Sequence, residues 1–291
     1  MKTGDKVRLI RKTATMLSQL DWGDIDLILR QFGFDWSYDW PNTDKYGYSL
    51  HHLEKSSDYE SKIVELHEFL NSKDKDIEES LAILTGPWAP HRFKLFISHI
   101  SEDRDKANEL KEKLALYGVD AFVAHADIKP TTEWQDEIEK ALDSCDAVIA
   151  ILTETFHESP WTDQEIGYCL KRRVLIIPLC VDINPYGFMG KYQGIKCKGQ
   201  DASTIAATIF ETLINRDLTS QQMAAGLVGY IEETPSWLEA NRRSGLLLRV
   251  KLWPPELLRR LEDALDRNSE ISGSFNAPSR IRQIVSLHKG K

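Results

Sequence analysis

Lys94-Leu-Phe-Ile-Ser-His-Ile-Ser101 is a short apolar run that ends abruptly in polar residues. Such a run predicts a buried strand followed by a loop, and open parallel α/β sheets bind ligands where their strands end. A second informative stretch is Ser159-Pro-Trp-Thr-Asp-Gln-Glu165, which carries a tryptophan and a carboxylate four residues apart. On a helix this spacing places Trp161 and Glu165 on one face. A carboxylate aimed into the crevice suits a substrate that becomes positively charged.

The region around these two stretches alternates short apolar runs with amphipathic segments. Strands are predicted at 94–98, 119–123, 147–152 and 174–179, and helices at 102–117, 132–143, 160–171 and 202–215. This alternation predicts a parallel sheet that is covered on both faces. Ser159 is expected to cap the helix at 160–171, with Pro160 in its first position. Glu165 then lies deeper than the first turn, where Asp163 is better placed to serve the helix dipole.

The composition is that of a globular protein with three regions. We predict an aromatic-rich helical region at residues 1–90, the α/β domain at 91–217 and a basic helical region at 218–291. The aromatic side chains of 33–56 stand beside aspartates, which favours a small aromatic core or a partner-binding surface over nucleic-acid binding. The basic residues that gather after Arg242 form either a solvated helical surface or a docking face for an acidic partner.

Charge and cysteine usage narrow the class of protein further. The formal net charge of −8 argues against nucleic acid as a partner of the whole chain. The four cysteines lack metal-ligand spacing, and the aromatic and aliphatic runs are too short to span a membrane. The first residues, Met-Lys-Thr-Gly-Asp-Lys, contain no apolar signal segment. We therefore expect a reduced, cytoplasmic protein without a membrane segment or a metal site.

The block from Phe93 to about Arg216 resembles a Toll/interleukin-1 receptor (TIR) domain of the bacterial kind. The matching pieces are Leu95-Phe-Ile-Ser-His99, Gly118-Val-Asp-Ala-Phe-Val123, Asp127-Ile-Lys-Pro-Thr-Thr-Glu-Trp134, Ala141-Leu-Asp-Ser-Cys-Asp-Ala-Val-Ile-Ala-Ile-Leu152, Ser159-Pro-Trp161 with Glu165, and Val174-Leu-Ile-Ile-Pro178. Their order and spacing make the joint match specific. One departure is Lys129-Pro-Thr-Thr132, where many relatives have a glycine, so the backbone is more restricted there.

The resemblance implies a flavodoxin-like sheet and, for bacterial and plant-type members, cleavage of NAD+ between nicotinamide and ribose. The products are nicotinamide and ADP-ribose or a cyclic ADP-ribose. The anomeric carbon becomes cation-like, as in glycoside hydrolysis. The family places its essential glutamate four residues after the tryptophan, which makes Glu165 the candidate catalytic residue. No P-loop or GxGxxG motif is present, so NAD+ is expected as a consumed substrate and not as a cofactor.

Five further residues are candidates for substrate binding: Ser98, His99, Lys129, Trp134 and Trp161. The serine and the histidine end the first predicted strand, and the histidine is either a ligand for ribose or phosphate or a loop residue bonded to backbone. The lysine is either a phosphate ligand or an exposed side chain. The tryptophans are candidates for stacking on nicotinamide or adenine, with packing on the sheet as the alternative for Trp134.

Three functions remain open on this resemblance. The first is an NAD+-cleaving immune effector in antiphage defence, activated when TIR domains associate with one another. The second is a signalling adaptor that only binds other TIR domains, because fold does not dictate function. The third is a base-exchange or deoxyribosyl-transfer enzyme with similar carboxylate chemistry. The intact pair of Trp161 and Glu165 favours the first.

Overall fold

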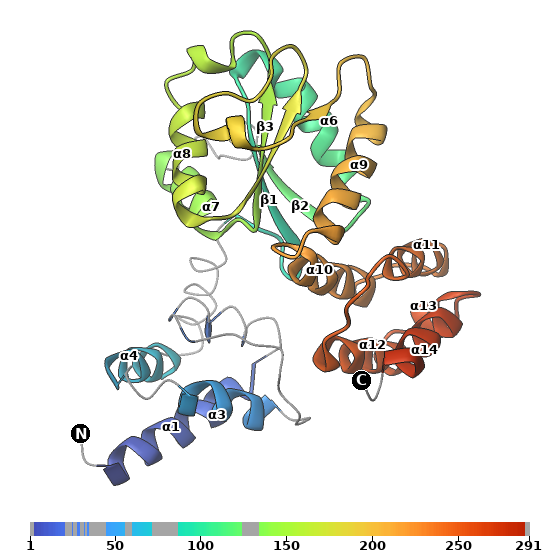
Figure 1. Ribbon diagram of the computed structural model, residues 1–291. Helices are drawn as coiled ribbons and strands as arrows, with labels where there is room; N and C mark the ends of the chain where they lie inside the picture. Colours follow the sequence, from blue (N-terminus) through green and yellow to red (C-terminus); the bar gives the residue numbers. More distant parts are fainter. Residues whose placement is uncertain are drawn as a thin grey trace. The chain divides into compact units, whose positions relative to one another are not determined.

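The computed structural model (Figure 1) describes residues 3–20, 25, 28, 29, 32, 34, 45–55, 60–71, 87–123 and 134–288. Contacts divide the chain into two compact units. One comprises Met1–Thr85 with Pro254–Glu256, and the other comprises Gly86–Trp253 with Leu257–Lys291. The second unit contains the sheet.

The sheet has five parallel strands in the order β2-β1-β3-β4-β5. The strands are β1 (Phe93–Ser98), β2 (Val119–Val123), β3 (Ala147–Leu152), β4 (Leu175–Cys180) and β5 (Ile195–Lys196). This is the strand order of flavodoxin-like sheets, so the predicted α/β class with helical flanking regions is confirmed. The apolar runs located the first four strands to within a residue. The two-residue strand β5 escaped prediction because it is too short to show a period.

Helices cover both faces of the sheet, because its strands carry apolar side chains on both sides. Figure 1 shows α6 (Arg104–Ala115) and α9 (Ala202–Asn215) over one face, and α7 (Trp134–Ser144) and α8 (Thr162–Arg172) over the other. Within β1, Leu95 and Ile97 pack in the core under α6 and α9, whereas Phe96 packs in the core under α7 and α8. The alternation along each strand therefore builds two separate cores.

The helices after α9 share one of these cores. They are α10 (Ser220–Glu232), α11 (Trp237–Leu247), α12 (Pro255–Arg267), α13 (Ser269–Ser272) and α14 (Ala277–His288). Buried side chains of α10, such as Leu227 and Ile231, belong to the same apolar cluster as the strands. A Cβ atom built on Gly229 would lie 2.3 Å from the carbonyl oxygen of His91. Helix α10 therefore packs closely at the amino end of β1, opposite the edge where the strands end.

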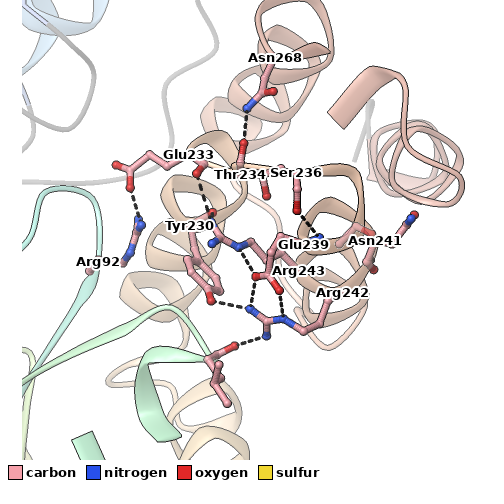
Figure 2. Close-up of polar contacts among 12 residues, drawn as sticks. Arg92, Tyr230, Glu233, Thr234, Ser236, Glu239, Asn241, Arg242, Arg243 and Asn268 are labelled. Atoms are coloured by element: carbon pink, nitrogen blue, oxygen red, sulfur yellow. Dashed lines mark hydrogen bonds and ion pairs between the residues drawn. The ribbon is translucent and has the colours of Figure 1, made fainter. Parts of the chain in front are cut away.

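A cluster of polar contacts around Tyr230 connects α10 and α11 to the C-terminal end of α6 (Figure 2). Arg242 donates to the Tyr230 hydroxyl and to the carbonyl of Leu116, both at 2.6 Å, and to both oxygens of Glu239. The guanidinium of Arg243 lies 3.8 Å from the centre of the Tyr230 ring. The hydrogen bond from Arg242 is the largest of the effects that lower the pKa of Glu239 to about 2. This carboxylate is therefore ionised at neutral pH and holds both arginines.

Many basic residues of the C-terminal helices bond within their own unit. Arg260 pairs with Glu232, with 2.9 Å between Nε and Oε1, and Arg249 pairs with Glu211 at 2.7 Å. Arg280 donates to the carbonyl of Asn241 at 2.7 Å. These contacts favour the solvated-surface interpretation of the basic region, whereas an acidic partner stays a prediction.

The N-terminal unit contains α1 (Thr3–Leu17), α3 (Lys45–Lys55) and α4 (Glu60–Leu70) around an apolar core of its own. Gly47 lies inside α3, although glycine has a low helix propensity. The buried Tyr48 and Leu53 explain why the helix tolerates it, because packing of an apolar face outweighs the low helix propensity of one glycine. Among the helices the structure describes, none combines the length and apolarity needed to cross a bilayer.

Candidate active site

Glu165 lies in the first turn of α8 with only 8% of its surface exposed. The helix begins at Thr162 and not at Pro160, so the prediction that Ser159 caps it is wrong. The Ser159 hydroxyl accepts a long, 3.3 Å bond from the N–H of Trp161, while the Thr162 hydroxyl donates to the carbonyl of Phe156 at 2.7 Å. The Ser-Pro pair forms the turn that precedes the helix instead of its first position. Glu165 is therefore nearer the positive end of the helix dipole than the sequence indicated.

A hydrogen bond joins this carboxylate to the end of β1. The Oγ of Ser98 lies 2.6 Å from Oε2 of Glu165, and both side chains are buried. Burial raises the pKa of the Glu165 carboxyl from its ordinary value of 4.5 to about 7, and the bond from Ser98 lowers it only in part. Near neutral pH the group therefore exchanges its proton readily, which is typical of residues in functional sites.

A cavity of about 570 Å³ opens beside the carboxylate. Its described lining residues are His99, Ile100, Ser101, Glu102, Ile138, Thr155, Glu158, Ser159, Pro160, Trp161 and Glu165. The volume falls within the roughly 300–1,000 Å³ of small-molecule and cofactor sites. Three of these lining side chains are carboxylates, and the described lining contains no lysine or arginine.

Three of the six predicted site residues line this cavity, and a fourth, Ser98, is bonded to one of them. Trp161 and Glu165 line it together, as the four-residue spacing predicted. His99 also lines it, and its Nδ1 lies 3.0 Å from the carbonyl oxygen of Ile97. Because a carbonyl only accepts, Nδ1 is the donor in this bond. Ser98 contributes through its bond to the carboxylate.

The other two predicted residues have no described side chain. Trp134 is the first residue of α7, but only its backbone is described. Lys129 lies outside the described residues. Their predicted contacts with substrate stay predictions.

Comparison with known proteins gives a family for the residues that form the sheet. The family model of the TIR domain matches residues 95–213. These residues form a TIR domain. The chain is also 30% identical over 110 residues to the "Probable 2' cyclic ADP-D-ribose synthase BdTIR" of Brachypodium distachyon. That match covers 37% of this chain and 48% of the relative, so the chain spans about half the length of the curated relative it matches.

A solved structure is similar as well. It is the crystal structure of the TIR domain of the Toll-related receptor TRR-2 from the lower metazoan Hydra magnipapillata. The TM-score is 0.34 at 20% identity, over 43% of this chain and 98% of that chain. The curated relative is a plant protein, and a bacterial kind of TIR domain stays a prediction.

Sequence reasoning missed the polar contacts that hold the connections of the TIR domain around the cavity. Asp103, which follows β1, is buried and accepts from the Thr153 hydroxyl and from Lys106, both at 2.7 Å. The Tyr186 hydroxyl donates to Oδ1 of Asp163 at 2.7 Å, and burial and this bond raise the pKa of the phenol. No local pattern marks such pairs, because their members are far apart in the sequence.

Proposed function

We propose that this TIR domain cleaves NAD+ at the bond between nicotinamide and ribose, with Glu165 as the catalytic carboxylate. The observation that carries the proposal is a buried glutamate in the wall of a nucleotide-sized cavity, at the edge where the strands end. The printed name of the plant relative, a probable cyclic ADP-ribose synthase, supports the same chemistry.

In the proposed reaction the carbon–nitrogen bond breaks and its electron pair leaves with nicotinamide. The leaving nitrogen becomes neutral and needs no proton, so a single carboxylate suffices. The sugar carbon becomes cation-like and is stabilised by the ionised Glu165. Water then attacks to give ADP-ribose, or a hydroxyl of the same molecule attacks to give a cyclic product.

The environment of Glu165 suits this role. Burial weakens the hydration of the carboxylate, so its attraction to a developing positive charge is stronger than it would be in water. Nicotinamide in NAD+ is already cationic, and its arrival therefore favours the ionised carboxylate. The Ser98 hydroxyl holds Oε2, which leaves Oε1 for the sugar.

Other cavity residues complete the proposed site. Trp161 is 38% exposed and offers a ring for stacking on nicotinamide or adenine. His99 lines the cavity and is a proposed contact for a ribose hydroxyl. Lys129 and Trp134 are further proposed contacts. NAD+ is a consumed substrate in this scheme.

The proposed biological role is that of an immune effector in antiphage defence, activated when TIR domains of several copies associate. The resemblance of residues 95–213 to TIR domains motivates this role.

Incubation of the purified, concentrated chain with NAD+ tests the proposal. Mass spectrometry should show free nicotinamide with ADP-ribose or a cyclic isomer. Glu165→Gln should abolish the release while circular dichroism shows an unchanged fold. Glu154→Gln is the matched control, because Glu154 is exposed on the same β3–α8 connection and is absent from the described cavity lining.

The outcome separates the enzyme from the adaptor. Unchanged release by a folded Glu165→Gln protein would contradict the assigned role of the carboxylate. If neither dilute nor associated wild-type protein releases nicotinamide, the adaptor that acts through contacts between TIR domains is the better description.

A further inference from the structure

Two glutamates that the proposed chemistry does not use line the cavity. Glu102 lies in the 3-10 turn Ser101–Asp103 after β1, and Glu158 lies in the 3-10 turn Phe156–Glu158 after β3. Strands β1 and β3 are hydrogen-bonded neighbours, so both turns stand at the same edge of the sheet. Both carboxylates are exposed, and Glu102 accepts a bond from the Ser101 hydroxyl at 3.0 Å.

These carboxylates contribute negative charge to the described wall of the cavity. The described lining holds the exposed Glu102 and Glu158 beside Glu165, and none of its described residues is a lysine or arginine. In a concave site the field of like charges adds, and it attracts cations and repels anions. The nicotinamide ring of NAD+ is a cation, whereas a further phosphate on the dinucleotide adds about −1.5 to −2 charges near neutral pH.

We propose that Glu102 and Glu158 act as a charge filter at the cavity. The filter favours the cationic nicotinamide–ribose end of the substrate and disfavours a dinucleotide that carries an additional ribose phosphate. NAD+ is therefore preferred over NADP+. This inference rests on the proposed function, since it concerns the substrate of the same site, but the filter itself is a binding property and is measurable without turnover.

Binding of two small probes tests the filter directly. Nicotinamide is neutral and 1-methylnicotinamide is a permanent cation of nearly the same shape. The full wild-type chain should bind the cation more tightly. The double variant Glu102→Gln/Glu158→Gln should lose about fivefold of this preference, the size expected for two partly solvated carboxylates. Glu154→Gln should retain it.

Salt and protein fold provide controls for the same titration. Potassium chloride should reduce the preference of the wild-type chain, because screening weakens interactions between exposed charges. Both substituted side chains are exposed, so the double variant should unfold at the wild-type temperature. A wild-type protein without preference for the cation, or a double variant with the full preference, overturns the filter.

Turnover adds a second and separable readout. The ratio of kcat/KM for NAD+ over NADP+ should fall about fivefold in the double variant, mainly through a lower KM for NADP+, and stay constant in Glu154→Gln. Release of nicotinamide with an unchanged ratio in the double variant would overturn the filter and keep the proposed function. Absence of release by both dilute and associated wild-type protein would refute the proposed function, and the probe titration would still test the filter.

Discussion

Replacement of Glu165 by glutamine should stabilise the folded protein in a manner that depends on pH. Glutamine keeps the shape of the side chain and an oxygen for the Ser98 hydroxyl, and it removes the buried charge. The pKa of the carboxyl rises from 4.5 to about 7 on folding. At about 1.36 kcal/mol per pH unit, this difference corresponds to about 3 kcal/mol of lost stability in the wild-type protein.

The sign follows from which state holds the proton. Below pH 4.5 the carboxyl is protonated in both states and its ionisation contributes nothing. As the pH rises to about 7, the unfolded chain loses the proton while the folded protein keeps it, so stability falls. Above that pH the full penalty is present. Glu165→Gln therefore gains little at acidic pH and about 3 kcal/mol at about pH 8.

Chemical denaturation of wild-type protein and variant over this pH range measures the effect. A gain of about 3 kcal/mol corresponds to a rise in the midpoint of thermal unfolding of about 6–12 °C for a unit of this size. Burial of the new amide adds an offset of about 1 kcal/mol at every pH, so the change with pH is the decisive quantity. Glu154→Gln controls for loss of one exposed charge. A stability difference between wild type and Glu165→Gln that is the same at every pH would refute the inference that the carboxyl is buried and partly protonated.

Three more predictions concern other contacts of the sheet-containing unit. In Ser98→Ala the loss of a donor to the carboxylate should move the midpoint of the pH–rate profile for nicotinamide release upward by about one pH unit. An unchanged midpoint would show that the Ser98 hydroxyl does not influence the protonation of Glu165. Gly229→Ala should destabilise the protein by about 1–3 kcal/mol in urea, because the new Cβ would lie 2.3 Å from the carbonyl oxygen of His91. Gly245→Ala, whose Cβ would meet only a side-chain atom at 3.6 Å, should be neutral. Truncation after Arg216 should give protein that aggregates in gel filtration, because it removes helices that share the core of the sheet. A soluble fragment that folds cooperatively would contradict this shared core.

The positions of four strands and one feature of the site could be predicted from the sequence. Four strands coincide with runs of apolar residues, because strands buried on both faces need such side chains at nearly every position. The interval between Trp161 and Glu165 predicted that both face one cavity, because one helical turn brings these positions to the same side. Each of these features depends on residues close together in the chain, where periodicity carries the information.

Other features depended on tertiary structure. The bond between Ser98 and Glu165 spans 67 positions, and the burial that raises the pKa of the carboxyl comes from several elements at once. The acidic lining needs Glu102 and Glu158, which follow different strands and look like ordinary exposed residues in the sequence. Likewise, the helices after Arg216 looked like a separate region, but they bury their apolar faces against the sheet. Which distant side chains meet is decided by packing of the whole unit, and no local pattern records it.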